Sequence, residues 1–307
     1  SIEQIEALAK ELGGLNWVAL SGGEPYLRKD LVEIKQAFYK HSRPNIMSHV
    51  TNGYYPDRIS DMTGKMAASC SKSKVLVIFS LDGLQETHER IRHSPGSFDR
   101  VRESIQAVQK HQSDYPNLET GVVITAQDNN QEELIPLIEY IESKLIPDGI
   151  YIHLHRDHTQ PSNVIVDPQV LMHYQEAVAF YESIRTKKNL KGRKLLDRLL
   201  DGKNKLQKRT ITKMAEENTY QLPCLAGKVS VVVDELGNVY ACELLKDPMG
   251  NLKNQSFKEI WFSEQARRLS DSITQDKCYC THECAMSSSL LFNPGKLFQS
   301  MISGVMT

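Results

Sequence analysis

Short apolar stretches alternate with amphipathic helical patterns through the first half of the chain. Five stretches predict strands buried in a sheet: 17–20, 46–50, 75–79, 121–125 and 150–154. Helical spacing lies between them, and each strand–helix unit spans about thirty residues. Because such alternation is typical of a parallel sheet or barrel, we predict an α/β fold.

The pattern changes near residue 167. Residues 168–187 predict one long helix, and 187–213 carry eleven Lys or Arg against two Asp. A solvated helical connector is the simpler interpretation of this basic segment, and a dock for an anionic partner or a phosphate-bearing substrate is the alternative. A hairpin at 228–243 and a helix at 256–269 follow.

The remaining tail, residues 287–307, is apolar and Ser-rich and predicts a capping segment. These changes predict three parts: a barrel at 1–166, a helical connector at 167–220 and a cysteine-rich extension at 221–307.

Charge and hydropathy narrow the classes of partner. The 37 basic residues balance 38 acidic ones, which argues against nucleic-acid or membrane partners. Apolar runs stay short of the roughly 18 residues that span a bilayer, and the sequence starts without a signal-peptide pattern. We therefore expect a cytoplasmic protein.

Cysteines gather late in the chain. Five of the six lie in the last third: Cys224, Cys242, Cys278, Cys280 and Cys284. In a reducing compartment such a group indicates metal ligands, for zinc or an iron–sulfur cluster, rather than disulfides. His282 is an alternative ligand that we rank below the thiolates. The remaining cysteine, Cys70, is expected to be a buried structural thiol.

Polar side chains follow the predicted strands. Each alone is typical of a cap or turn, but parallel strands bring their ends to one face, where the residues would line a pocket. The set comprises Glu24, Thr51, Asn52, Ser80, Asp82, Thr125, His153, His155 and Arg156. Asp82 is the candidate catalytic residue, as a base or as a group that orients the substrate.

Three blocks in this order resemble radical S-adenosylmethionine (SAM) enzymes. They are Ser21-Gly22-Gly23-Glu24-Pro25, then Phe79-Ser80-Leu81-Asp82-Gly83 with His88 and Arg92 behind it, and the late cysteines. Cys224 and Cys242, with Gly237 before the latter, resemble the opening of a SPASM or twitch extension. The number of later cysteines matches a twitch domain with one auxiliary 4Fe–4S cluster more closely than a full SPASM domain with two.

The resemblance implies a partial (β/α)6 barrel of the TIM type with a small C-terminal twitch/SPASM-like extension. It places SAM on residues Gly22, Gly23 and Glu24 at its methionyl amine, Thr51, Asn52 and Ser80 near ribose and carboxylate, Val123 and Thr125 near adenine, and His153 and His155 on the last strand. Four of the five late cysteines would hold the auxiliary cluster.

The implied activity is hydrogen abstraction by a 5′-deoxyadenosyl radical from an unactivated C–H bond of a peptide or sugar-like small molecule. Flavodoxin or ferredoxin would donate electrons. The family's Cys-x3-Cys-x2-Cys motif for the catalytic 4Fe–4S cluster belongs before the Gly-Gly-Glu turn, whereas the first cysteine here is Cys70. We expect a missing N-terminal segment to supply it. The alternatives are a chain that has lost radical initiation, or a non-catalytic SAM- or partner-binding barrel with structural zinc.

Overall fold

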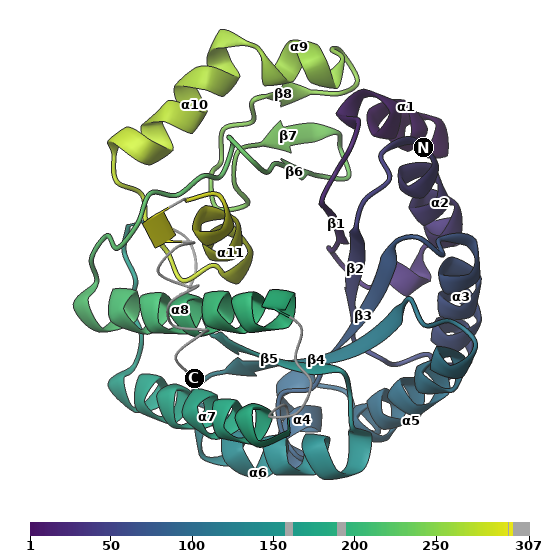
Figure 1. Ribbon diagram of the computed structural model, residues 1–307, viewed down its shortest axis with the longest axis vertical. Helices are drawn as coiled ribbons and strands as arrows, with labels where there is room; N and C mark the ends of the chain where they lie inside the picture. The colour runs from purple at the N-terminus through teal and green to yellow at the C-terminus, as the bar shows by residue number, and fades with distance from the viewer. Residues whose placement is uncertain (157–161, 189–194, 294, 297–307) are drawn as a thin grey trace. The chain divides into compact units, whose positions relative to one another are not determined.

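A computed structural model describes residues 1–156, 162–188, 195–293 and 295–296 of the chain (Figure 1). Two compact units divide it, Ser1–His153 and Leu154–Thr307. Within the described part of the chain, none of the helices is long and apolar enough to cross a membrane.

The first unit is built on a five-stranded sheet. Its strands are β1 (Trp17–Leu20), β2 (Ile46–Thr51), β3 (Lys74–Ser80), β4 (Leu118–Ala126) and β5 (Gly149–Leu154), and they lie in chain order. The pairs β1–β2, β2–β3 and β3–β4 are parallel. The predicted α/β sheet is therefore confirmed, and β4 begins three residues before the predicted strand because Leu118 to Thr120 pair with β3.

Helices connect successive strands, as the alternating pattern predicts. They are α2 (Leu31–His41), α3 (Pro56–Ser69), α4 (Gln85–Arg92), α5 (Ser97–Gln109) and α6 (Leu134–Tyr140), and α1 (Ile2–Leu12) precedes β1. Figure 1 shows α2, α3 and α5 along one side of the sheet. The opposite side of the sheet curves inward and is called the concave face. Short 3-10 turns lie at Pro25–Leu27 (η1), Lys110–Ser113 and Gln131–Glu133, and a π-helical turn covers Ile141–Leu145. The helix predicted at 132–144 therefore consists of three consecutive segments, a 3-10 turn, the α-helix α6 and the π-helical turn.

The first strand differs from its prediction. Val18 is buried against Ala9, Ile34 and Phe38, but Trp17 is 43% exposed. β1 lies at the end of the sheet order and alternates between an exposed and a covered face. The expectation of a fully buried strand at 17–20 was therefore wrong, because helices cover only one side of it.

The second unit contains two long helices, α7 (Pro168–Lys188) and α8 (Leu195–Glu217), and a small antiparallel sheet of β6 (Val232–Val233), β7 (Asn238–Tyr240) and β8 (Gly250–Asn251). The predicted hairpin is confirmed, with shorter arms. Residues 189–194 of the basic segment lie outside the described residues.

The described part of this unit contains three further helices: α9 (Phe257–Trp261), α10 (Glu264–Gln275) and α11 (Glu283–Leu291). The single helix predicted at 256–269 was wrong, because the Ser263 hydroxyl accepts a hydrogen bond from the Ala266 N–H and caps a new helix. Residues 287–291 of the predicted capping segment belong to α11, and most of the remainder lies outside the described residues.

Candidate functional site

The Gly-Gly turn after β1 is open to solvent. Ser21, Gly22 and Gly23 are exposed, and a Cβ placed on either glycine would have nothing within 4 Å. Gly22 has φ of +115°, a backbone conformation that other residues rarely adopt. The turn therefore presents main-chain groups that a ligand can approach closely.

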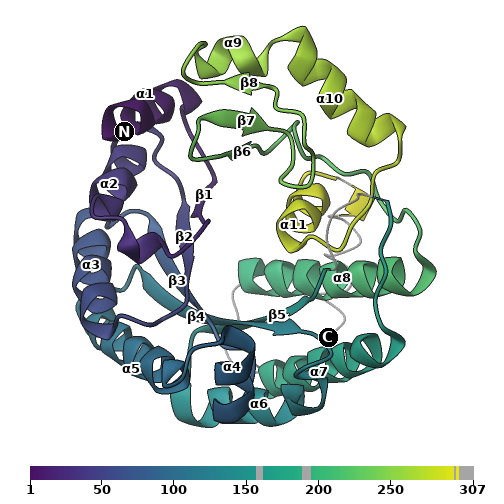
Figure 2. The same cartoon turned by 180° about the vertical axis from the view of Figure 1, so that it is seen from behind.

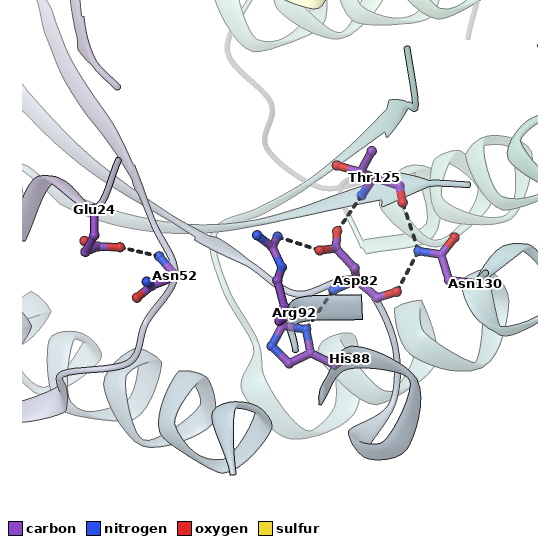
Figure 3. A network of polar contacts seen from close by, with 7 residues as sticks. All are labelled: Glu24, Asn52, Asp82, His88, Arg92, Thr125 and Asn130. Carbon is purple, nitrogen blue, oxygen red and sulfur yellow. Dashed lines mark hydrogen bonds and ion pairs between the residues drawn. The ribbon is translucent and has the colours of Figure 1, made fainter. Parts of the chain in front are cut away.

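Glu24 ties this turn to the end of β2. Its Oε1 accepts hydrogen bonds from the Thr51 hydroxyl (2.9 Å) and the Tyr26 N–H (3.1 Å). Its Oε2 accepts one from the Asn52 N–H at 2.7 Å (Figure 3). Because three donors hold the carboxylate, Glu24 is suited to fix the turn and to place negative charge beside a ligand ammonium group.

Tyr26 anchors the same turn to the buried interior of the unit. Its side chain is fully buried, and its hydroxyl lies 2.7 Å from His49 Nε2 and 2.5 Å from Thr63 Oγ1. Burial holds the pKa of His49 well below its usual range, with the nearby Lys35 adding to the effect, so the ring is neutral. Sequence reasoning missed Tyr26, although a tyrosine directly after Glu-Pro was the available signal.

Asp82 joins the ends of β3 and β4. Its Oδ1 accepts the Thr125 N–H at 3.0 Å, and its Oδ2 pairs with Arg92 Nη2 at 2.5 Å (Figure 3). Asn130 Nδ2 donates to the main-chain oxygens of both Asp82 (2.6 Å) and Thr125 (2.9 Å). Both carboxylate oxygens thus have protein partners, so these contacts favour an orienting role, and a catalytic role for Asp82 stays a prediction.

His88 supports this network from α4. Its Nδ1 accepts the Asp82 N–H at 3.2 Å. Burial lowers the pKa of His88 to about 4, and the charge of Asp82 only partly opposes that shift. The imidazole is therefore neutral at physiological pH, as an accepting Nδ1 requires.

Asn130 was not singled out from the sequence, since it lies within a run of polar loop residues.

The other predicted SAM contacts divide between the two units. Thr51 and Ser80 are buried at strand ends, Asn52 is exposed, and Val123 pairs with Ser80 across the sheet. His153 is half-buried on β5. His155 and Arg156 belong to the second unit, where Arg156 pairs with Glu243 at 3.2 Å. Their assignment to a SAM or strand-end pocket stays a prediction.

Four of the five late cysteines line one cavity in the second unit. They are Cys224, Cys242, Cys278 and Cys280, and the walls include Leu222, Leu245 and Met286. Cys284 is exposed on α11 and is absent from this lining. Within the described residues, no three His, Cys, Asp or Glu side chains are grouped so as to hold a single metal ion.

The four lining thiols also influence one another electrostatically. Burial, followed by the charges of Cys224, Cys280 and Cys242, raises the pKa of Cys278 to about 12. Burial, opposed by the His282 N–H and reinforced by Cys242 and Cys224, raises the pKa of Cys280 to about 11. Although the residue as a whole is exposed, desolvation of the Cys284 thiol and then the charges of Glu243 and Glu283 raise its pKa. Four mutually opposed thiolates in an apolar pocket fit a polynuclear iron–sulfur group, which supplies the positive charge they need.

His282 is engaged elsewhere. Its Nε2 lies 3.0 Å from Glu243 Oε1, and its buried Nδ1 has no hydrogen-bond partner. The contact with Glu243 favours the thiols over His282 as ligands, and the place of His282 in the ligand set stays a prediction.

Two family models match the chain, one within each of its two units. One, described as the radical SAM superfamily, matches residues 1–141, and one described as an iron–sulfur cluster-binding domain, SPASM, matches residues 224–285. The chain belongs to the radical SAM superfamily. Its branch within that superfamily is the one with a SPASM or twitch extension, and membership implies SAM and 4Fe–4S clusters as cofactors.

Curated relatives and solved structures agree with this placement. An AdoMet-dependent heme synthase of Methanosarcina barkeri is 26% identical over 88% of this chain and 74% of its own length. An Fe-coproporphyrin III synthase of the same organism is 30% identical over 50% of this chain and 36% of its own. Native anSMEcpe with bound AdoMet aligns with a TM-score of 0.61 at 17% identity, over 100% of this chain and 86% of that one. This last likeness shows the fold, a partial TIM barrel, which confirms the predicted fold class.

Proposed function

We propose that the protein is a radical SAM enzyme that removes a hydrogen atom from an unactivated C–H bond of an iron tetrapyrrole. The observation that carries the proposal is the match to the heme synthase over 88% of the chain. The second relative is also named for an iron tetrapyrrole. Neither name concerns a peptide or a sugar, so the peptide or sugar-like substrate expected from the sequence becomes an alternative outcome of the test.

The concave face of the sheet supports a flat, apolar substrate. Side chains alternate along each strand, and on this face Trp17, Val50 and Tyr151 are each more than a third exposed. Such exposure of large apolar side chains along one sheet face favours a ligand with a broad apolar surface. A tetrapyrrole ring has that surface, whereas a sugar would call for more hydrogen-bonding groups.

The chain's own residues have distinct proposed roles. Gly22 and Gly23 present main-chain groups to the SAM amine, and Glu24 fixes them. Ser80, Val123 and Thr125 hold the rest of SAM, and Asp82 orients Arg92 and the Thr125 backbone. When bound, SAM and its cluster supply the radical that abstracts hydrogen, and the auxiliary cluster supplies an electron acceptor.

The test is an anaerobic reaction with SAM, a chemical reductant and iron coproporphyrin III, in which the reconstituted protein carries the N-terminal segment expected to supply the Cys-x3-Cys-x2-Cys motif. We expect 5′-deoxyadenosine and a porphyrin of altered mass to form together. Metal-free coproporphyrin and a cysteine-containing peptide are matched controls. Turnover of the peptide but not the iron porphyrin would overturn the substrate proposal, and SAM binding without any cleavage would favour the non-catalytic barrel.

A further inference from the structure

Helices α8 and α11 of the second unit lie against each other (Figures 1 and 2). Ile211 of α8 and Met286 of α11 belong to one apolar cluster, and the two helices are also joined by a polar contact. Such a contact is unexpected in the basic segment 187–213, whose lysines the sequence assigns to solvent. Several of its polar side chains instead turn inward, toward the helix that follows the cysteine loop.

Lys203 is one of these buried side chains, at 9% exposure, and Gln207 is another, at 7%. Its Nζ donates to Gln207 Oε1 at 2.9 Å and to Ser287 Oγ at 3.0 Å. Both acceptors are neutral, so the two hydrogen bonds do not balance the ammonium charge. A buried charge is costly unless opposite charge lies close by, and the carboxylate of Glu283 is the nearby charge that favours the ammonium form of Lys203.

Glu283 supplies one anchor at the start of α11. Gln207 Nε2 donates to the Glu283 main-chain oxygen at 3.1 Å and also bonds its carboxylate Oε2. Lys208 Nζ lies 2.6 Å from the other carboxylate oxygen, and both of these side chains are largely buried. A carboxylate in the first turn of a helix also gains from the helix dipole.

These contacts hold the end of the cysteine loop. Glu283 begins α11 three residues after Cys280, and the main-chain N–H of His282, between them, acts on the Cys280 thiol. Movement of the first turn of α11 would therefore move a residue of the cysteine-lined cavity.

We propose that Lys203, Gln207 and Lys208 form a clamp that holds Glu283 and Ser287 of α11 and thereby positions the Cys278–Cys280 loop for the auxiliary cluster. A 4Fe–4S cluster with four thiolate ligands is an anion, and hydrogen bonds and charges around it set its potential. The clamp is independent of the substrate, so it goes beyond the proposed function and can be tested without turnover.

The decisive variant is Lys203→Met, which removes the charge and both hydrogen bonds at nearly constant volume. Lys213→Met, on the exposed side of the same helix, is the matched control, since its side chain is 57% exposed. Cys242→Ala identifies the signal of the auxiliary cluster in the electron paramagnetic resonance spectrum. The measurements are iron loss to a chelator, the midpoint potential of that signal, and thermal unfolding of the cluster-free protein.

We expect Lys203→Met to release the auxiliary iron about tenfold faster, as typical for groups that support metal ligands, and to shift the potential to a more negative value. Gln207→Leu should speed iron release through loss of the Glu283 contact, with a smaller change in potential. Lys213→Met should change neither. If Lys203→Met lowers only the unfolding temperature of the cluster-free protein and leaves iron release and potential unchanged, the residue is structural and the clamp is overturned.

Discussion

The strand-end site of the first unit and the cysteine cavity of the second solve the same problem in opposite ways. At the strand ends, the protein's own donors already satisfy the charges: Glu24 accepts three hydrogen bonds, and Asp82 pairs with Arg92. In the cavity, burial and then the charges of neighbouring thiols raise the pKa of Cys278 and Cys280, which disfavours the thiolate form that binds metal. The first site is preorganised by the fold, while the second needs its cofactor to be electrostatically complete.

The largest effect that would test this contrast comes from a single cysteine. Cys280→Ser should abolish retention of the auxiliary cluster, because it removes one of the four lining thiols. Cys284→Ser should keep the cluster, since that side chain lies outside the lining. Iron and sulfide per chain after anaerobic reconstitution measure both. Equal loss of iron in the two variants would show that Cys284 is a ligand and that the ligands of the cluster are not the four cysteines that line the cavity.

A smaller effect is expected at Asp82, where the fold rather than the cofactor provides the balancing charge. Asp82→Ala should lower the free energy of unfolding by about 2 to 3 kcal/mol, because it leaves Arg92 and the Thr125 N–H without their partner. Chemical denaturation of the cluster-free chain measures this. Full stability combined with lost turnover would instead favour Asp82 as a base.

The first unit also contains a buried ionisable group, Lys35, whose protonation can be compared with that of the buried thiols in the second unit. Burial lowers the pKa of Lys35 to about 7, and the ammonium donates to the Ser48 carbonyl at 3.0 Å. The unfolded chain binds more protons than the folded one between pH 7 and 10.5, so stability should rise with pH there, by up to about 2 kcal/mol from pH 7 to 9.

The groups facing Lys35 titrate outside most of that window. The pKa of His49 is lowered far below neutrality, and burial raises the pKa of Cys70, which opposes the trend only at higher pH. Denaturant midpoints at several pH values, with Lys35→Met as the control, measure the effect. A wild-type slope equal to that of Lys35→Met would contradict a buried, titrating lysine.

The smallest effect is expected for Glu24, whose proposed role is to shape the SAM site rather than to take part in the reaction. Glu24→Ala should weaken SAM binding about tenfold, ~1.4 kcal/mol, because the Gly22-Gly23 turn loses its tie to β2. Thermal shift or calorimetry with SAM measures it. Glu24→Gln, which keeps the shape and one acceptor oxygen, should weaken binding less, and the reverse order would argue that charge alone matters.

Sequence patterns predicted the regular parts of the molecule well and the contacts between distant residues poorly. Five strands follow from apolar stretches alternating with helices, because most residues of these strands are buried in a parallel sheet. The break at Phe262–Ser263 was missed, since one serine cap outweighs a continuous apolar spacing. Lys203 was missed for a different reason: a run of basic residues hides the one that faces inward.

The candidate site shows the same limit. Glu24 and Asp82 were found because they follow strands, and the late cysteines because they are clustered. Tyr26 contacts His49, 23 residues away in the chain, and Asn130 contacts Asp82, 48 residues away. No local pattern contains such partners. The separation of Cys284 from the other four thiols likewise depends on packing of α11 rather than on spacing.

Gly121 gives the concave face a property that no side chain encodes. A Cβ at this position would lie 2.7 Å from Cε2 of Tyr151, too close for the ring to keep its place. The ring therefore rests on a bare stretch of main chain. A single methyl group, introduced by Gly121→Ala, would lift it and reshape the floor. The depth available to a bound molecule is thus adjustable by one of the smallest changes a gene can make, which offers a route to altered selectivity without touching the cofactors.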